Sequence, residues 1–140
     1  MKILSIDFGT KRVGLALSDE TETFAHRIDP IENYIDEKEL IIKLAKIIEF
    51  EKISEVLVGL PLGVDEKETE MSKKISSFVQ SLRSIINSSV KTVNETYTTK
   101  MAYSNLGRAK GKKSIDSESA RILLQEYLDD KKLKLKENNK

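Results

Sequence analysis

The stretch that decides the fold is residues 2–18, KILSIDFGTKRVGLALS. Residues 2–7 are mostly apolar and end on Asp7, a pattern typical of a buried strand. Residues 13–18 alternate between large apolar side chains and the small residues glycine, alanine and serine. One face of this second strand is therefore expected to lie close against another element. The short glycine-containing connection between the two strands predicts a hairpin.

The rest of the chain alternates between strands and helices. Residues 22–28 form a weaker strand, and residues 56–61 form a strand buried on both faces, as in parallel sheets. A helix of about four turns begins after Asp36, and apolar spacing predicts another over 66–86 with Met71 in the core. Further along we expect a strand over 90–95, a helix over 99–106, a basic loop over 107–113, a helix that begins at Asp116, and a frayed basic tail over 131–140. This order predicts an α/β fold with a sheet of mixed direction, in one domain over 1–130.

Composition excludes several classes of function. The chain has 140 residues, about one domain, with 24 Lys and Arg against 23 Asp and Glu. It has no cysteine, which excludes disulfides, zinc–thiolate sites and cysteine nucleophiles. It has a single histidine, His26, which is expected to be structural or exposed. One histidine alone excludes the usual histidine-based metal, triad and acid–base schemes. Without a signal peptide or an apolar stretch long enough for a membrane span, we expect a cytoplasmic protein with no membrane partner.

Three carboxylates fall where α/β sheets bind their ligands. Asp7 and Glu95 each end a predicted strand, and Asp116 begins a predicted helix on its core-facing side. Grouped carboxylates repel one another unless a hard divalent cation such as Mg²⁺ or Mn²⁺ lies between them. One or two such ions can activate water and stabilise the leaving oxygen of a phosphodiester. This pattern favours a nuclease that needs no histidine.

Each of these acids also has an ordinary structural explanation. Asp116 is a favourable helix N-cap, Asp7 can start an Asx turn, and Glu95 can be a surface acid. Residues 7–10 also resemble the phosphate-binding turn of actin-like ATPases. Those enzymes need two domains around the nucleotide, which 140 residues cannot supply. Only the joint placement of the three acids favours a shared site.

Basic residues gather in the last third of the chain. Residues 94–140 hold 11 Lys and Arg against 7 Asp and Glu, whereas residues 1–93 hold 13 against 16. A basic rim beside a carboxylate centre suits a nucleic-acid backbone, although such a loop can also be merely solvated. Arg12 in the first turn can pair with a nearby acid instead of binding a phosphate. Thr98 and Thr99 can cap a helix instead of binding a phosphate. The candidate substrate-binding residues are Arg12, Thr98, Thr99, Arg108, Lys110, Lys112 and Lys113.

Four segments, in order along residues 6–128, resemble the motifs of the YqgF family. They are IDFGTKRVGLALSD at 6–19, VGLPL at 58–62, NETYTT at 94–99, and KSID at 113–116 with LLQEYL at 123–128. The resemblance implies an RNase H-like fold. That fold has a five-stranded mixed sheet of order 3-2-1-4-5, with strand 2 antiparallel to the rest and helices on both faces.

The resemblance also implies a metal-dependent nuclease that acts on pre-16S rRNA in 5′-end processing. The acidic residues of the family fall on Asp7, Glu95 and Asp116, which would act in catalysis and hold Mg²⁺ or Mn²⁺. The sequence departs from the family pattern at residues 94–96, NET instead of Asp-Glu-Arg, and at 116–120, DSESA instead of Asp-Ala-x-Ala-Ala. Glu118 in the second departure either faces solvent or supplies an extra acid.

Two other functions stay open. The family also resembles Holliday junction resolvases of the RuvC type, and a resolvase of branched DNA is expected to act as a two-fold dimer. Alternatively, the departures at 94 and 96 suit a non-catalytic RNA-binding factor in ribosome assembly. The sequence therefore predicts a nucleic-acid partner and leaves open whether the protein is a monomer or a homodimer.

Overall fold

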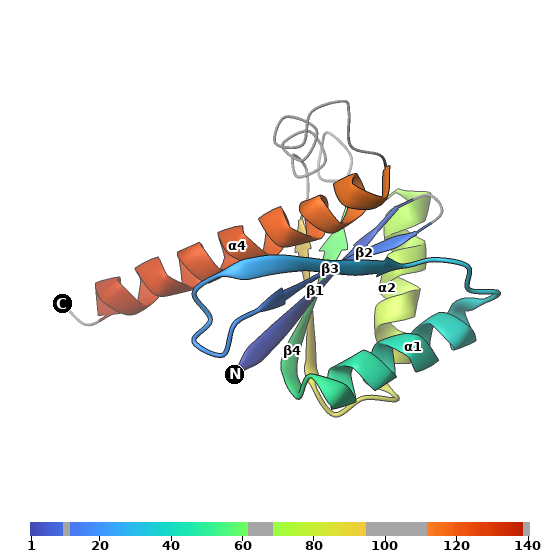
Figure 1. Cartoon of the computed structure of the whole chain (residues 1–140), viewed down its shortest axis with the longest axis horizontal. Coiled ribbons are helices and arrows are strands. Elements are labelled where there is room, and N and C mark those ends of the chain that lie inside the picture. The colour runs from blue at the N-terminus through green and yellow to red at the C-terminus, as the bar shows by residue number, and fades with distance from the viewer. Residues whose placement is uncertain (10–11, 62–68, 95–111, 139–140) are drawn as a thin grey trace.

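The protein forms a five-stranded sheet with helices on both faces (Figure 1). The computed structural model describes residues 1–9, 12–61, 69–94 and 112–138, with side chains in the last range from residue 117 onward. In chain order the elements are β1 (Lys2–Phe8), β2 (Val13–Ser18), β3 (Ala25–Ile31), α1 (Glu37–Phe50), β4 (Ile53–Leu60), α2 (Glu70–Arg83), β5 (Ser89–Asn94) and α4 (Lys112–Asn138). This arrangement confirms the predicted α/β fold.

The sheet has the strand order β3-β2-β1-β4-β5. Strands β1, β4 and β5 run parallel, whereas β2 is antiparallel to both of its neighbours. The strand order and the antiparallel second strand expected from the family resemblance are therefore confirmed. Because β1, β4 and β5 are parallel, their carboxyl ends meet at one edge of the sheet, where ligands of such sheets bind.

The two faces of β1 pack against different helices. Leu4 and Ile6 belong to the larger core cluster, which α1 and α2 complete. Ile3 belongs to a second cluster, in which Ala120 of α4 and the small residue Ala16 of β2 are fully buried. This contact confirms that the small-residue face of β2 is closely packed. Side chains of a strand alternate between faces, so Asp7 lies on the α4 side with Ile3.

Helix α1 begins as its sequence predicts. The Asp36 side chain accepts a hydrogen bond from the Glu39 backbone N–H at 2.9 Å, which makes Asp36 the N-cap. The Glu39 carboxylate in turn accepts from the backbone N–H of Ile35 at 3.2 Å. The return bond therefore reaches the residue before the N-cap rather than the N-cap itself. The pair satisfies two backbone donors, as a capping box does.

The third strand and Met71 differ from their predicted positions. The third strand spans Ala25–Ile31 instead of 22–28, because Asp19 closes a turn by accepting hydrogen bonds from the N–H groups of Thr23 and Phe24. Met71 is 41% exposed rather than in the core, because it lies in the first turn of α2, where the helix meets the sheet edge.

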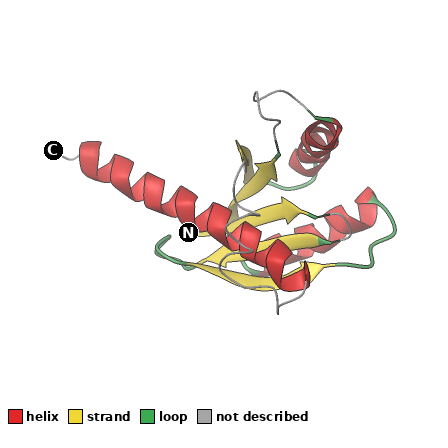
Figure 2. Ribbon diagram, turned by 90° about the horizontal axis from the view of Figure 1, so that it is seen from above, coloured by secondary structure: helices red, strands yellow, loops and turns green. Residues whose placement is uncertain are grey.

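Helix α4 is longer at both ends than predicted. It begins at Lys112, so Asp116 lies inside the helix and is not its first residue. It continues through Asn138, whereas a frayed tail was expected from residue 131, and its end extends beyond the strands (Figures 1 and 2). Ion pairs of 3.2 Å from Lys131 to Glu22 and from Lys134 to Asp130 support these last turns.

In the ranges that the structure describes, no helix is long and apolar enough to cross a membrane. The helix expected over 99–106 lies outside them.

A cluster of polar side chains binds α4 to the sheet near the amino end of β1. Glu55 of β4 is 8% exposed and accepts hydrogen bonds of 2.8 Å from the Tyr127 hydroxyl and from the Lys91 ammonium group. Burial by itself would raise the pKa of Glu55, but the bonds from Lys91 and Tyr127 outweigh burial and hold this pKa below its ordinary value. The ionised carboxylate is therefore the form that the folded protein favours.

Replacing a buried leucine of α4 tests its packing on the sheet. Leu124 is fully buried, and we expect Leu124→Ala to lower the free energy of unfolding by about 2–5 kcal/mol because it leaves a cavity. Leu135→Ala is the matched control on the same helix, because Leu135 is 58% exposed, and it should change stability by less than about 1 kcal/mol. Urea denaturation followed by circular dichroism measures both. Equal effects would contradict the packing described here.

The Glu55 cluster predicts how stability depends on pH. A carboxyl group whose pKa is lower in the folded state stabilises the fold above its unfolded-state pKa, and this stability is lost as the pH falls through the folded-state pKa. The difference in unfolding free energy between the wild type and Glu55→Gln should therefore be large at neutral pH and shrink in acid. The exposed residue Glu49 provides the control Glu49→Gln. A difference that does not change with pH would show that the charge of Glu55 contributes nothing.

Candidate active site

Asp7 provides a buried carboxylate at the carboxyl edge of the sheet. It is the second-last residue of β1 and is 5% exposed. Its partner across the antiparallel pair is Gly14 of β2. Opposite residues of such a pair share one face, so a side chain at position 14 would lie against the Asp7 carboxylate. Because glycine has no side chain, β2 places none against Asp7 at this position.

Helix α4 runs antiparallel to β1 across this face. The Ser5 hydroxyl donates a hydrogen bond of 2.9 Å to the backbone oxygen of Ala120. Further along the helix, Tyr127 binds Glu55, which is level with Ile3 in the sheet. Later helix residues therefore lie over earlier strand residues. The start of α4 consequently points to the end of β1 that carries Asp7.

The helix and strand spacings bring position 116 to the same edge as Asp7. Two residues along a strand cover about 6.6 Å, and four residues along a helix cover about 6 Å. The step from Ser5 to Asp7 thus matches the step back along α4 from Ala120 to Asp116. The backbone places Asp116 one turn before the residue that binds Ser5.

Ser117 holds this end of α4 against an irregular part of the sheet. Its hydroxyl donates to the backbone oxygen of Ile28 at 2.9 Å and accepts from the N–H of Leu15 at 3.5 Å. The pairing of β2 with β3 shifts register between Val13 and Leu15. Ser117 is 3% exposed, so its hydroxyl bridges two strands inside the protein. The bridge fixes how α4 is turned at the residue after Asp116.

Glu118 was expected either to face solvent or to supply an extra acid, and the structure shows that it does not face solvent. It is 5% exposed, and its carboxylate forms an ion pair of 3.8 Å with Arg27 of β3 and a second one with Arg121. Two arginines thus neutralise this buried acid. The polar residues at 117 and 118 both serve to bind α4 to β2 and β3.

Arg12 forms the ion pair that the sequence left open as its alternative role. Its Nε lies 3.1 Å from a carboxylate oxygen of Glu32. Its backbone oxygen accepts a hydrogen bond of 2.8 Å from the N–H of Gly9, which helps to close the predicted hairpin. A phosphate contact by Arg12 stays a prediction.

The remaining predicted site residues are placed only in part. Lys112, Lys113 and Asp116 belong to the first turns of α4, where the structure describes the backbone. Among the side chains that it describes, no three acidic or histidine residues form a metal site. The grouping of the three carboxylates therefore stays a prediction. Glu95, Thr98, Thr99, Arg108 and Lys110 lie outside the described residues.

Sequence reasoning missed the residues that position this site. Ser5 is a polar residue within an otherwise apolar strand, and it is fully buried, so its hydroxyl needs a partner. This polar interruption of an apolar strand is the signal in the sequence that points to such a contact. Ser117 had a weaker signal, because only the departure from the family pattern marked it.

Comparison with known proteins shows the family of this chain. A family model described as "RuvX: Holliday junction resolvase" matches residues 1–130. A protein of Maridesulfovibrio salexigens named "Putative pre-16S rRNA nuclease" is 37% identical over 133 residues, covering 91% of this chain and 98% of its own length. A protein of Dictyoglomus turgidum with the same name is 33% identical and covers 92% of this chain and 94% of its own length.

Solved structures show the same fold at low identity. RuvC of T. thermophilus, solved in complex with a Holliday junction substrate, superimposes with a TM-score of 0.61 at 12% identity and covers 94% of this chain and 95% of its own. The yeast mitochondrial Holliday junction resolvase Ydc2 has a TM-score of 0.55 at 11% identity, with 90% and 77% covered. These likenesses confirm the RNase H-like fold. The family match and the relatives above 30% identity show that this chain belongs to the RuvX family, also called YqgF.

Proposed function

We propose that this protein is a metal-dependent nuclease that hydrolyses phosphodiester bonds in structured RNA, in the 5′-end processing of pre-16S rRNA in the cytoplasm. One observation carries the proposal. The buried carboxylate of Asp7 lies at the carboxyl edge of the central strand, and α4 is fixed so that position 116 reaches the same edge. The family and the names of the relatives support the reaction class and the RNA substrate.

The proposed metal ligands are Asp7, Glu95 and Asp116. Lys91 binds Tyr127 of α4 and Val93 packs in the α4 cluster, and Glu95 follows them at the same two-residue spacing in the sequence. Carboxylate oxygens are the ligands that Mg²⁺ and Mn²⁺ prefer, and Gly14 of β2 places no side chain against Asp7, so this donor set fits such an ion. When bound, the ion supplies a Lewis acid that activates water and stabilises the leaving oxygen.

The protein's own groups would bind and orient the substrate. The backbone N–H groups at the start of a helix favour anions, and α4 begins with Lys112 and Lys113. Arg12 is held by a partly exposed ion pair, which is a weak interaction, so a phosphate could replace Glu32 at little cost. Thr98, Thr99, Arg108 and Lys110 are further proposed phosphate contacts from the sequence.

A second candidate function is the resolution of branched DNA. The description of the family and the shared fold with RuvC favour it. It uses the same carboxylates but requires a dimer, because a four-way junction is cut on two symmetric strands. The substrate that is cleaved and the mass of the protein in solution separate the two functions.

The Asp7→Asn variant tests the proposed catalytic role. It keeps the size of the side chain but removes the charge that would hold the ion. Since the loss of groups that only support metal ligands costs about 10–100-fold, we expect cleavage to fall by at least ~100-fold. The assay uses a 5′ fragment of pre-16S rRNA and a four-way DNA junction, each with Mg²⁺ or Mn²⁺. The control is Asp29→Asn, an exposed acid on β3.

The outcomes of this assay separate the candidates. Loss of RNA cleavage in Asp7→Asn alone is the expected result. Unchanged cleavage by this variant would show that Asp7 is not catalytic. Preferential cleavage of the junction would favour the resolvase. Tight RNA binding without cleavage by the wild type would favour a non-catalytic assembly factor.

A further inference from the structure

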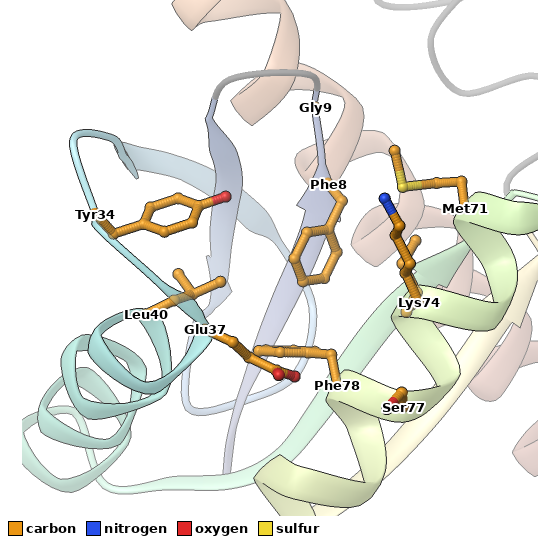
Figure 3. A pocket seen from close by; sticks show the side chains of 10 residues that line it. Phe8, Gly9, Tyr34, Glu37, Leu40, Met71, Lys74, Ser77 and Phe78 are labelled. Carbon is orange, nitrogen blue, oxygen red and sulfur yellow. The ribbon is translucent and has the colours of Figure 1, made fainter.

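We propose that a cavity on the opposite face of the sheet binds the base of a nucleotide next to the cleaved phosphate. This inference rests on the proposed nuclease function and adds a base-binding subsite to it. The cavity has a volume of about 410 Å³ and opens between α1 and α2 at the carboxyl end of β1 (Figure 3). Ligand cavities are commonly of this size. Its walls include Phe8, Tyr34, Glu37, Met71, Lys74 and Phe78.

The cavity and Asp7 share one edge of the sheet. Phe8 follows Asp7 directly, so the side chains of these two residues lie on opposite faces of β1. Gly9, the next residue, also lines the cavity. A nucleic-acid strand with one phosphate at Asp7 that passes over this edge would bring a neighbouring nucleotide to the mouth of the cavity.

Aromatic rings line two sides of the cavity. Phe8 is held by Phe78 in an edge-to-face contact, with ring centroids 4.8 Å apart and an angle of 79°. Tyr34 lies on the other side of the cavity, on the segment before α1 (Figure 3). Bases stack on such rings in proteins that bind single strands. A base that enters the cavity would therefore meet a ring held in place.

Two charged residues of the cavity can bind polar groups of a nucleotide, one the phosphate and the other the base. Lys74 comes from α2, and its ammonium group lies on the same side of the cavity as Met71 (Figure 3). It is exposed and can bind a phosphate. Glu37 comes from α1 and can accept hydrogen bonds from the amino groups of a base. A purely apolar ligand would use neither charge, and a free phosphate would not use the apolar floor formed by Ile75 and Phe78.

Met71 gains an explanation from this cavity. It is 41% exposed although it belongs to the apolar stripe of α2, and it forms part of the cavity wall. Its flexible thioether can pack against a base of any identity. The exposure of Met71 and the partial exposure of Phe8 and Tyr34 are thus features of one open binding surface.

Base stacking can be measured without cleavage. The full chain carrying Asp7→Asn is titrated into short single-stranded RNAs from the 5′ fragment, each with the fluorescent base 2-aminopurine at one position. We expect quenching at one position close to the cut, and an abasic site there should weaken binding by about 10-fold, as typical for loss of one stacked base. Tyr34→Leu should remove the quenching, and Lys74→Gln should weaken binding about 5-fold.

Matched variants and melting curves serve as controls. Lys73→Gln changes an exposed neighbour on α2 that does not line the cavity, and Phe24→Leu changes an aromatic residue that is 68% exposed on the surface. Neither should alter quenching or affinity. Circular dichroism melting shows whether Tyr34→Leu and Lys74→Gln are folded like their controls.

The results separate this proposal from the nuclease proposal. If no position shows quenching that depends on Tyr34, or if an abasic site at every position leaves the affinity unchanged, the cavity does not bind a base. That result leaves metal-dependent cleavage by the wild type unaffected. Quenching that depends on Tyr34, together with no cleavage by the wild type with any metal, would overturn the proposed nuclease function. It would still support the base-binding subsite.

Discussion

The hydrogen bond from the Ser5 hydroxyl to the Ala120 backbone oxygen determines where α4 lies on the sheet. It is 2.9 Å long, and both residues are fully buried. A buried hydroxyl without a partner is costly, so β1 accepts α4 in a position that satisfies Ser5. The Ser117 bridge to β2 and β3 fixes the rotation of the helix. Together they bring Asp116 to the edge where the buried Asp7 lies.

The two faces of the sheet carry different groups, and both sets of groups lie at this edge. On the α4 side lies the buried residue Asp7, opposite Gly14 of β2. On the side of α1 and α2 lies an aromatic cavity with Lys74 at its wall. Asp7 and Phe8 are consecutive in β1, so their side chains lie on opposite faces of the sheet at the same edge. A strand of nucleic acid that crosses the edge would contact both faces, so the scissile phosphate and a base can be held by neighbouring residues.

The positions of most strands and helices could be predicted from the sequence, because apolar periodicity acts locally, whereas the strand order followed from the resemblance to the YqgF family. Strand β2 and the N-cap Asp36 were placed correctly for this reason. The third strand was displaced, since the turn closed by Asp19 depends on side-chain hydrogen bonds. The start of α4 was missed, because the Asp116 motif resembles an N-cap locally. The role of Ser5 could not be predicted, because its partner lies 115 residues away.

The central claim is that Asp7 and the start of α4 form one cation site. Paramagnetic Mn²⁺ broadens the NMR signals of nearby backbone amides, so it can locate the site in solution. We predict that a small amount of Mn²⁺ selectively broadens the amides of Gly9, Gly14 and the first turns of α4, while that of Leu135 stays sharp. In Asp7→Asn the selective broadening should disappear. Broadening elsewhere, or the same broadening in Asp7→Asn, would contradict the account.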